Sequence, residues 1–244
     1  MASSPSFASD EPIPSPEVSA ESAKKISFTF QDDVVSRYVW RGFALSRGPV
    51  MQPAFEVEAY GFIAEIWSNF VLNNEHNQGR FSEVDPSLEY HYHLGPVEIV
   101  PAFEGYIFIN QPGVSNTAEA QLRLSYTVHD LTLTTSQNFD VVHSPGGYYG
   151  DFSIGYEREL VRKLSLQTAT GIGWADAKFN AVNGGLSQAA LNVFFWRLGF
   201  TWSALAFLDL TPHLDVNVIL DPDLRAAQAD PTLVSGGLLA SLHF

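Results

Sequence analysis

The sequence predicts an all-β fold, a transmembrane antiparallel up-and-down β-barrel of twelve strands, on three observations. Apolar and polar residues alternate along most of the 244 residues. The connections between the alternating segments are long and short in turn, and aromatic residues gather near the segment ends. Such alternation places one apolar and one polar side on each strand. Short periplasmic turns and longer extracellular loops are typical of outer-membrane barrels.

The composition agrees with this class and excludes several others. Hydrophobic residues make up 45% of the chain and charged residues only 16%, against roughly 25% charged in an ordinary soluble domain. No apolar stretch reaches about 18 residues, which excludes helical membrane spans. The absence of cysteine excludes disulfides, thiolate metal sites and cysteine nucleophiles. A net charge of -14 argues against a nucleic-acid partner.

The first 24 residues differ from the rest, because they are rich in Ser, Pro, Ala and Glu and show no apolar periodicity. We expect residues 1–24 to be a flexible leader and residues 25–244 to form the barrel. The leader has neither the basic start nor the apolar run of a secretory signal peptide, so the signal is absent from this chain.

Each alternating segment then predicts one strand. In residues 117–128, for example, Ala118, Leu122 and Leu124 share one face, whereas Glu119 and Arg123 share the other. The twelve predicted strands cover residues 26–40, 52–60, 62–71, 84–94, 97–108, 117–128, 131–140, 148–158, 164–174, 189–202, 207–220 and 232–244. Long connections follow the first, third, fifth, seventh, ninth and eleventh strands, and short ones follow the others. A soluble sandwich has no reason to show this asymmetry.

Aromatic residues of the apolar faces predict two belts at the membrane interfaces, where amphipathic rings are enriched. The belt near the short turns comprises Phe28, Phe30, Phe62, Tyr90, Tyr92, Tyr126, Tyr156, Trp202 and Phe207, and the belt near the long loops comprises Tyr38, Trp40, Phe70, Phe139 and Trp174. The alternative is core packing in a soluble barrel. The last strand alternates and ends on Phe244, a pattern that resembles the signal read by the outer-membrane barrel assembly machinery.

A sequence motif in the first three predicted strands suggests a family. It resembles the Gcw_chp family of proteobacterial outer-membrane proteins of unknown function. The motif of that family begins with Ser-x-Tyr-x-x-Arg-Gly, continues with a Ser, a Gln and a Gly, and ends with Trp-x-Ser-Asn. The matching residues are Ser36, Tyr38, Arg41, Gly42, Ser46, Gln52, Gly61, Trp67, Ser68 and Asn69. Here Trp67 directly precedes Ser68, which departs from the pattern. The resemblance covers residues 33–70 and implies an outer-membrane barrel, but no activity.

The polar faces predict an acidic interior. We expect the lumen to be lined by Arg37, Glu56, Glu58, Glu65, Glu89, His91, His93, Glu98, Glu104, Glu119, Arg123, Asp151, Glu157, Arg197, Asp209 and Asp215. Asp32 falls on the lipid face unless a bulge shifts the register. Because the acids outnumber the three arginines, part of the lumen should be hydrated, which favours small cationic solutes and a narrow, cation-preferring porin-like channel. The alternative is a sealed structural or partner- or lipid-binding barrel held by an internal Arg–carboxylate network.

Metal binding and catalysis have weaker support, so we predict no metal, no cofactor and no enzyme. Glu89, His91 and His93 share a strand face and offer metal-ligand types, but on a single strand. The loop pair His143-Ser144 lies near Asp140, yet adjacent residues of an extended loop point apart.

Two arginines of the first long loop leave a further alternative open. Arg41 and Arg47 can bind lipopolysaccharide phosphates through paired hydrogen bonds. Alternatively, Arg37 and Arg41 point inward and neutralise acids such as Glu56 or Glu65. We prefer the inward position for Arg37 and leave Arg41 open. The predicted location is the outer membrane of a Gram-negative bacterium.

Overall fold

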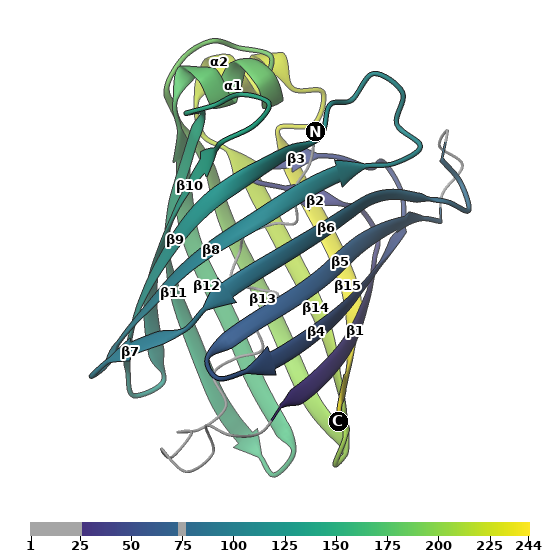
Figure 1. The fold of residues 1–244 in the computed structure, drawn as a ribbon, viewed down its shortest axis with the longest axis vertical. Coiled ribbons are helices and arrows are strands. Elements are labelled where there is room, and N and C mark those ends of the chain that lie inside the picture. The colour runs from purple at the N-terminus through teal and green to yellow at the C-terminus, as the bar shows by residue number, and fades with distance from the viewer. Residues whose placement is uncertain (1–25, 73–76) are drawn as a thin grey trace.

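One antiparallel sheet of 13 strands closes on itself to form the wall of a barrel (Figure 1). In this computed structural model the described residues are 26–72 and 77–244, so the predicted leader at residues 1–24 lies outside them. Because β7 continues β6 beyond a break at His91, the closed wall is a 12-strand barrel, which confirms the predicted fold class. The wall strands are β1 (Ser27–Val35), β4 (Val50–Ala59), β5 (Phe62–Val71), β6 (Phe81–Tyr90), β7 (Tyr92–Leu94), β8 (Val97–Phe108), β9 (Thr117–Val128), β10 (Leu131–Asp140), β11 (Tyr148–Val161), β12 (Leu164–Ala175), β13 (Ala190–Leu205), β14 (Leu208–Ile219) and β15 (Thr232–His243).

The barrel closes between its first and last strands. β1 pairs with β15 on one side and with β4 on the other, in an unbroken register from Thr29 opposite His243 to Val35 opposite Gly237. The backbone N–H of Phe244 donates to the carbonyl of Phe28 at 2.9 Å. No strand edge therefore remains open at this seam, as a membrane-spanning sheet requires.

The predicted alternation decides which side chains face inward. On β1, Phe28, Phe30 and Val34 lie on the exposed outer face, whereas Gln31 and Asp33 are buried inside. Asp32 lies on the outer face, in agreement with its parity, since no bulge interrupts the pairing of β1.

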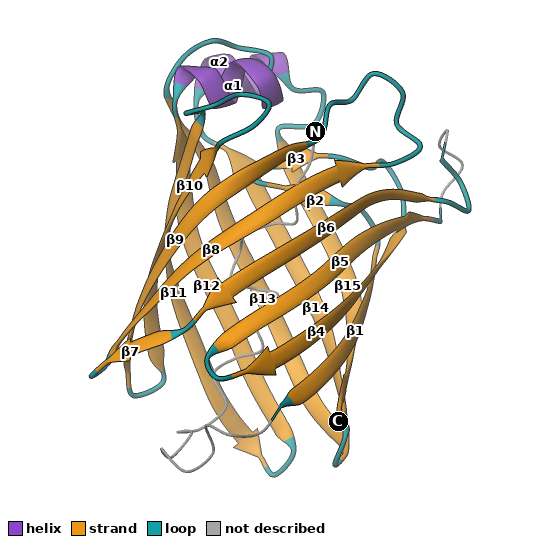
Figure 2. Cartoon of the chain, in the orientation of Figure 1, coloured by secondary structure: helices purple, strands orange, loops and turns teal. Residues whose placement is uncertain are grey.

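The two ends of the barrel differ as the loop lengths predict. Two short helices, α1 (Ala177–Asn183) and α2 (Pro222–Ala227), lie over the end with the long loops, and the C-terminus lies at the opposite end (Figure 2). Asp176 and Asp221 cap the helices by accepting backbone N–H bonds. Neither helix, nor any other in the described ranges, has the length and apolar character to span a bilayer.

The first predicted strand is wrong at its C-terminal end. It stops at Val35 rather than at residue 40, and the chain turns inward through a short hairpin of β2 (Val39–Trp40) and β3 (Phe43–Ala44). Tyr38 and Trp40 are only 3% and 4% exposed, so they are not part of an aromatic belt on the lipid face. We refer to residues 36–49 as the plug hairpin.

A glycine on the last strand allows a contact between its two neighbouring strands. Gly237 of β15 lies between His213 of β14 and Val35 of β1 in the strand register. Since it has no side chain, the His213 imidazole passes over it and its Nε2 lies 2.9 Å from Asp33 Oδ2.

We therefore expect Gly237→Ala to lower the free energy of unfolding by about 1–3 kcal/mol, because the new methyl group would lie against the His213 ring and 2.7 Å from Val35 Cγ1. Heat-dependent gel mobility of the barrel in detergent measures this loss. The matched control is Gly236→Ala, whose added atom would come no closer than 3.4 Å to a neighbour. Equal melting temperatures for the two variants would contradict the assigned contact.

Candidate functional site

The plug hairpin reverses inside the barrel through a left-handed turn. Arg41 and Gly42 have φ angles of 46° and 85°. A Cβ at Gly42 would approach Val193 Cγ2 of β13 at 2.8 Å and Ile219 Cδ1 of β14 at 2.9 Å. Glycine is therefore needed here both for its conformation and because the hairpin tip touches the wall.

Local hydrogen bonds define the shape of the hairpin. Ser46 Oγ accepts from the Tyr38 backbone N–H at 2.8 Å and donates to the Gly48 carbonyl at 2.8 Å. The Leu45 N–H donates to the Tyr38 carbonyl at 2.9 Å. These bonds satisfy backbone groups that the hairpin takes out of water, so the segment can lie in the barrel interior.

The hairpin tip is attached to the wall by a buried ion pair. Arg41 Nη1 and Nη2 donate to the two carboxylate oxygens of Glu119 on β9 at 2.8 and 2.7 Å. Both side chains are buried, with 1% exposure at Arg41 and 6% at Glu119. Burial alone would lower the pKa of Arg41, but the Glu119 carboxylate outweighs burial and raises that pKa, so the guanidinium stays charged.

Three aromatic rings surround the same guanidinium. Its central carbon lies 4.6 Å from the ring centre of Trp40, 4.4 Å from that of Tyr149 and 5.5 Å from that of Phe179. Ring faces attract a cation, most strongly where water is excluded. We call Glu119, Trp40, Tyr149 and Phe179 the guanidinium box.

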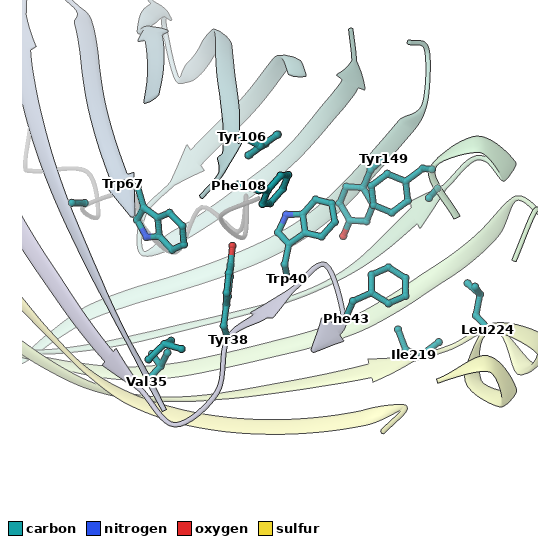
Figure 3. Close-up of a cluster of buried hydrophobic side chains, with 14 residues drawn as sticks. Val35, Tyr38, Trp40, Phe43, Trp67, Tyr106, Phe108, Tyr149, Ile219 and Leu224 are labelled. Carbon is teal, nitrogen blue, oxygen red and sulfur yellow. The ribbon is translucent and has the colours of Figure 1, made fainter. Parts of the chain in front are cut away.

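Aromatic packing completes the plug, as Figure 3 shows for the side chains between the walls. Tyr38 packs on Trp67 of β5 with ring centres 5.5 Å apart, and Trp40 packs on Phe179 of α1 at 5.5 Å. Phe43 and Leu224 of α2 belong to the same buried cluster. Burial, followed by the nearby carboxylates of the β6 strand, raises the pKa of the Tyr38 hydroxyl.

The barrel is consequently filled at its long-loop end. Inward side chains from strands all round the wall are at most 1% exposed there, namely Val50, Tyr106, Tyr149, Val193, Ile219 and Leu233. Towards the short turns the interior is more open: the side chains of Glu89 and Glu98 are 20% and 22% exposed, and those of Arg197 and Asp215 are both 21% exposed. We call the described interior between the plug and the short turns the vestibule.

The inner wall carries carboxylates in direct register. Glu104 of β8 is paired with Glu119 of β9, which is paired with Asp140 of β10. Glu56 of β4 is likewise opposite Glu65 of β5. Like charges directly opposite one another repel, so each such row favours a cation nearby.

Two mixed ion clusters lie in the vestibule. Arg123 lies 2.8 Å from Glu89, and His91 joins Glu89 at 3.2 Å to Glu98 at 2.8 Å. His93 is 70% exposed and lies 3.5 Å from Glu98. The described residues hold no group of three or more side chains arranged to bind a metal ion.

The second cluster surrounds His213, between two acids. Its Nδ1 lies 2.7 Å from Asp215, whose other oxygen lies 3.4 Å from Arg197. Asp33 completes the cluster through its contacts with His213 and with Arg197 at 3.8 Å. Sequence reasoning missed His213 and Asp33 here, although both share the parity of their inward-facing neighbours.

The predicted lining residues of the strands have the inward parity of the wall, with Glu58 exposed at the short-turn end, and their lining of a pore stays a prediction. The prediction for Arg37 is wrong: it lies at the start of the plug hairpin with its guanidinium 3.5 Å from Asp230, and it does not neutralise Glu56 or Glu65. Arg41 is buried and thus does not face lipopolysaccharide. Glu83 and Asp85 of β6 also face inward and were missed, although they share the parity of Glu89.

The residues of the Gcw_chp-like motif that lie on β4 and β5 support the plug hairpin. Trp67 lies under Tyr38, and Gln52 Nε2 donates to Asn69 Oδ1 at 3.2 Å. Asn69 Nδ2 in turn donates to Ser82 at 2.8 Å. The motif therefore includes residues of the plug hairpin and residues of the wall strands that contact it.

The candidate catalytic residues of the fourth long loop have a structural role. Asp140 Oδ1 accepts from the backbone N–H groups of Val142 and Ser144, both at 2.9 Å, and its Oδ2 accepts from Thr117 at 2.6 Å. The carboxylate thus caps the loop turn.

Comparison with known proteins identifies the fold without a family. No family model and no curated protein matches the chain, so the resemblance to Gcw_chp is not confirmed. Among solved structures, the NanC porin has a TM-score of 0.55 at 11% identity, covering 87% of this chain and 98% of its own. The KdgM porin in complex with disordered oligogalacturonate has a TM-score of 0.53 at 11% identity, covering 89% and 99%. The COG4313 outer membrane channel from Pseudomonas putida F1 has 0.52 at 10% identity, covering 93% and 100%.

The buried ion pair leads to a test of the plug. We expect Glu119→Gln to accelerate backbone hydrogen exchange over residues 38–46 by at least about tenfold, because stranding one member of a buried pair costs about 3–5 kcal/mol. Mass spectrometry of the protein in micelles measures this exchange. Glu58→Gln at the exposed short-turn end is the control. Unchanged protection in Glu119→Gln would show that the aromatic contacts alone hold the hairpin.

Proposed function

We propose that this chain is a gated, cation-preferring channel for small solutes, located in the outer membrane of a Gram-negative bacterium and closed by its first outer loop. The observation that carries the proposal is the combination of one discrete plug with an acidic vestibule beneath it. The porin-like fold supports transport over catalysis, since the compared NanC, KdgM and COG4313 structures are porins or channels.

Cation preference is supported by the sign of the interior charge. The in-register pair Glu56–Glu65 and the row from Glu104 through Glu119 face the lumen. A negatively charged lumen with apolar surroundings concentrates cations and repels anions. The KdgM structure contains an oligogalacturonate, which carries carboxylates; the acids here favour a solute of the opposite charge.

Gating is supported by unfavourable free-energy terms in the conformation of the seated hairpin. Arg41 adopts a left-handed conformation that is unfavourable for a residue with a side chain. Among the described residues, neither Arg41 Nε nor Trp40 Nε1 has a hydrogen-bond acceptor, although both are buried. Each unsatisfied donor costs about 1–3 kcal/mol, so release of the hairpin recovers part of the energy of its contacts.

A sealed structural or partner-binding barrel is the second candidate. The tight aromatic packing of Tyr38 on Trp67 and of Trp40 on Phe179 favours it, because such contacts are typical of permanent cores. The two candidates differ in whether the hairpin leaves its seat.

The envelope setting is part of the same proposal. Exposed rings such as Trp202 and Phe62, 52% and 49% exposed, suit contact with lipid. Arg47 of the outer loop suits lipopolysaccharide phosphates, and the β15 strand ending at Phe244 suits recognition by the barrel assembly machinery. Membership of the Gcw_chp family remains a hypothesis that rests on residues 33–70.

Planar-bilayer recording tests the channel. We expect the wild-type barrel to be closed most of the time, and Gly42→Ala and Glu119→Gln to raise the open probability at least about tenfold. The first variant introduces a clash with Val193 and Ile219 at the hairpin tip, and the second removes the charge that pairs with Arg41. If both variants fold and insert but never conduct, the sealed barrel is correct. Steady conduction by the wild type would contradict the hairpin's role as a plug.

Ion selectivity tests the acidic lining separately. In the Gly42→Ala background, we expect Glu56→Gln combined with Glu65→Gln to lower the potassium-to-chloride permeability ratio several-fold, since two lumen charges are lost. Reversal potentials across a salt gradient measure this ratio. Glu159→Gln, at the exposed end of β11, is the control. An unchanged ratio would remove the assigned role of this pair.

A further inference from the structure

We propose that the guanidinium box is a binding site for small guanidinium-bearing solutes, which Arg41 occupies as a tethered ligand when the barrel is closed. The inference rests on the proposed function in one respect, namely that the hairpin can leave the box. It adds a ligand class and a site to that function.

The geometry of the box fits one chemical group closely. Glu119 receives two parallel hydrogen bonds from Arg41, at 2.8 and 2.7 Å, while the Trp40 and Tyr149 rings lie 4.6 and 4.4 Å from its central carbon. A planar guanidinium matches a carboxylate with two bonds and stacks on rings, whereas an ammonium does neither equally well. The box therefore distinguishes guanidinium from other monovalent cations.

Most of the box does not belong to the hairpin. Glu119 is part of β9, Tyr149 is part of β11, and Phe179 is part of α1, so only Trp40 leaves with Arg41. Glu119 and Tyr149 are held by paired wall strands, and α1 is capped by the Asp176 carboxylate. A preformed site remains when the hairpin is displaced, which lowers the cost of binding a free ligand.

The carboxylates around the box favour a cation. Glu104 is opposite Glu119 on the neighbouring strand, and Tyr106 Oη bridges the two carboxylates at 2.6 and 3.0 Å. Asp151 and Glu104 both interact electrostatically with Arg41. Once Arg41 leaves, these acids face one another without it, and their buried negative charge is relieved either by proton uptake or by another cation.

A recess leads to the box from the long-loop end. It lies between the hairpin, α1 and the loop after β10, and its cavity volume is about 30 Å³, which is the size of a small water site. Trp40, Glu119 and Phe179 of the box form part of its lining, together with Asp140 and Asn183 near the mouth. Glu119 therefore lies at the inner end of this recess, and a solute at the outer face reaches it once the hairpin is displaced. Binding of the solute and seating of Arg41 exclude each other.

The experiment removes the Arg41 guanidinium from the box by substitution and then adds free guanidinium. In the full chain carrying Arg41→Gln, we expect guanidinium chloride at up to about 10 mM to raise the melting temperature and slow hydrogen exchange around Glu119 and α1 in a saturable manner. Ammonium and tetramethylammonium chloride at equal concentration should act about tenfold more weakly, because they lack the second parallel hydrogen bond. Arg41→Gln combined with Glu119→Gln is the matched control, in which the guanidinium effect should vanish.

Planar-bilayer recording of the wild-type protein provides an independent test. Guanidinium at the outer side should raise the open probability at least twofold over ammonium, because it competes with Arg41 for Glu119. This arm decides the matter if Arg41→Gln does not fold. Equal effects of guanidinium and ammonium, or a guanidinium effect that persists without Glu119, would overturn the proposal. Failure of the channel proposal differs from this, since hairpin-release variants would not conduct while guanidinium still stabilised Arg41→Gln.

Discussion

Closure of the sheet is the constraint on which the rest of this structure depends. A strand backbone in hydrocarbon must pair on both edges, and the β1–β15 seam meets that need with an unbroken register. Period two then sends every second side chain into the interior, so a lipid-facing wall of Phe and Leu necessarily has a polar inner face. Since a 12-strand barrel encloses a narrow space, that polar face is crowded, and a short loop segment is enough to fill one end of it.

The acidic inner face explains why the plug ends in an arginine. Glu104, Glu119 and Asp140 lie side by side on adjacent strands, an arrangement that repels itself unless a cation is present. A lysine would supply the charge, but it would bond only one oxygen at a time and would stack less well on Tyr149 and Trp40. Arg41 instead meets both oxygens of Glu119 and three rings, so the same residue neutralises the wall and positions the hairpin.

Local pattern was sufficient for the wall but not for its filling. The predicted strands 97–108, 117–128 and 131–140 agree with the structure to the residue, because alternation and short turns are local signals. The predicted end of the first strand was wrong because Tyr38 and Trp40 continue its alternation past Val35, although the chain has already turned inward.

The partner of Arg41 could not be predicted from local pattern. It lies 78 residues away, and the pairing depends on how β9 faces the hairpin, which the pattern of a single strand does not contain. Helices α1 and α2 are too short to show a helical period, and Asp33, Glu83 and Asp85 were missed although parity alone places them inside.

The long-loop end therefore combines two requirements that oppose each other. Burial of Tyr38, Trp40 and Phe43 stabilises the seated hairpin in the way a core does. Burial of a charged tip works against it, because a desolvated ion pair contributes little net energy even with good geometry, and Arg41 Nε has no acceptor among the described residues. A permanently sealed barrel would have less need of the charge, since an apolar tip would fill the same space. An arginine at this position instead adds the Glu119 carboxylate to the contacts that seat the hairpin, so that, under the proposed function, a competitor for Glu119 weakens its seating.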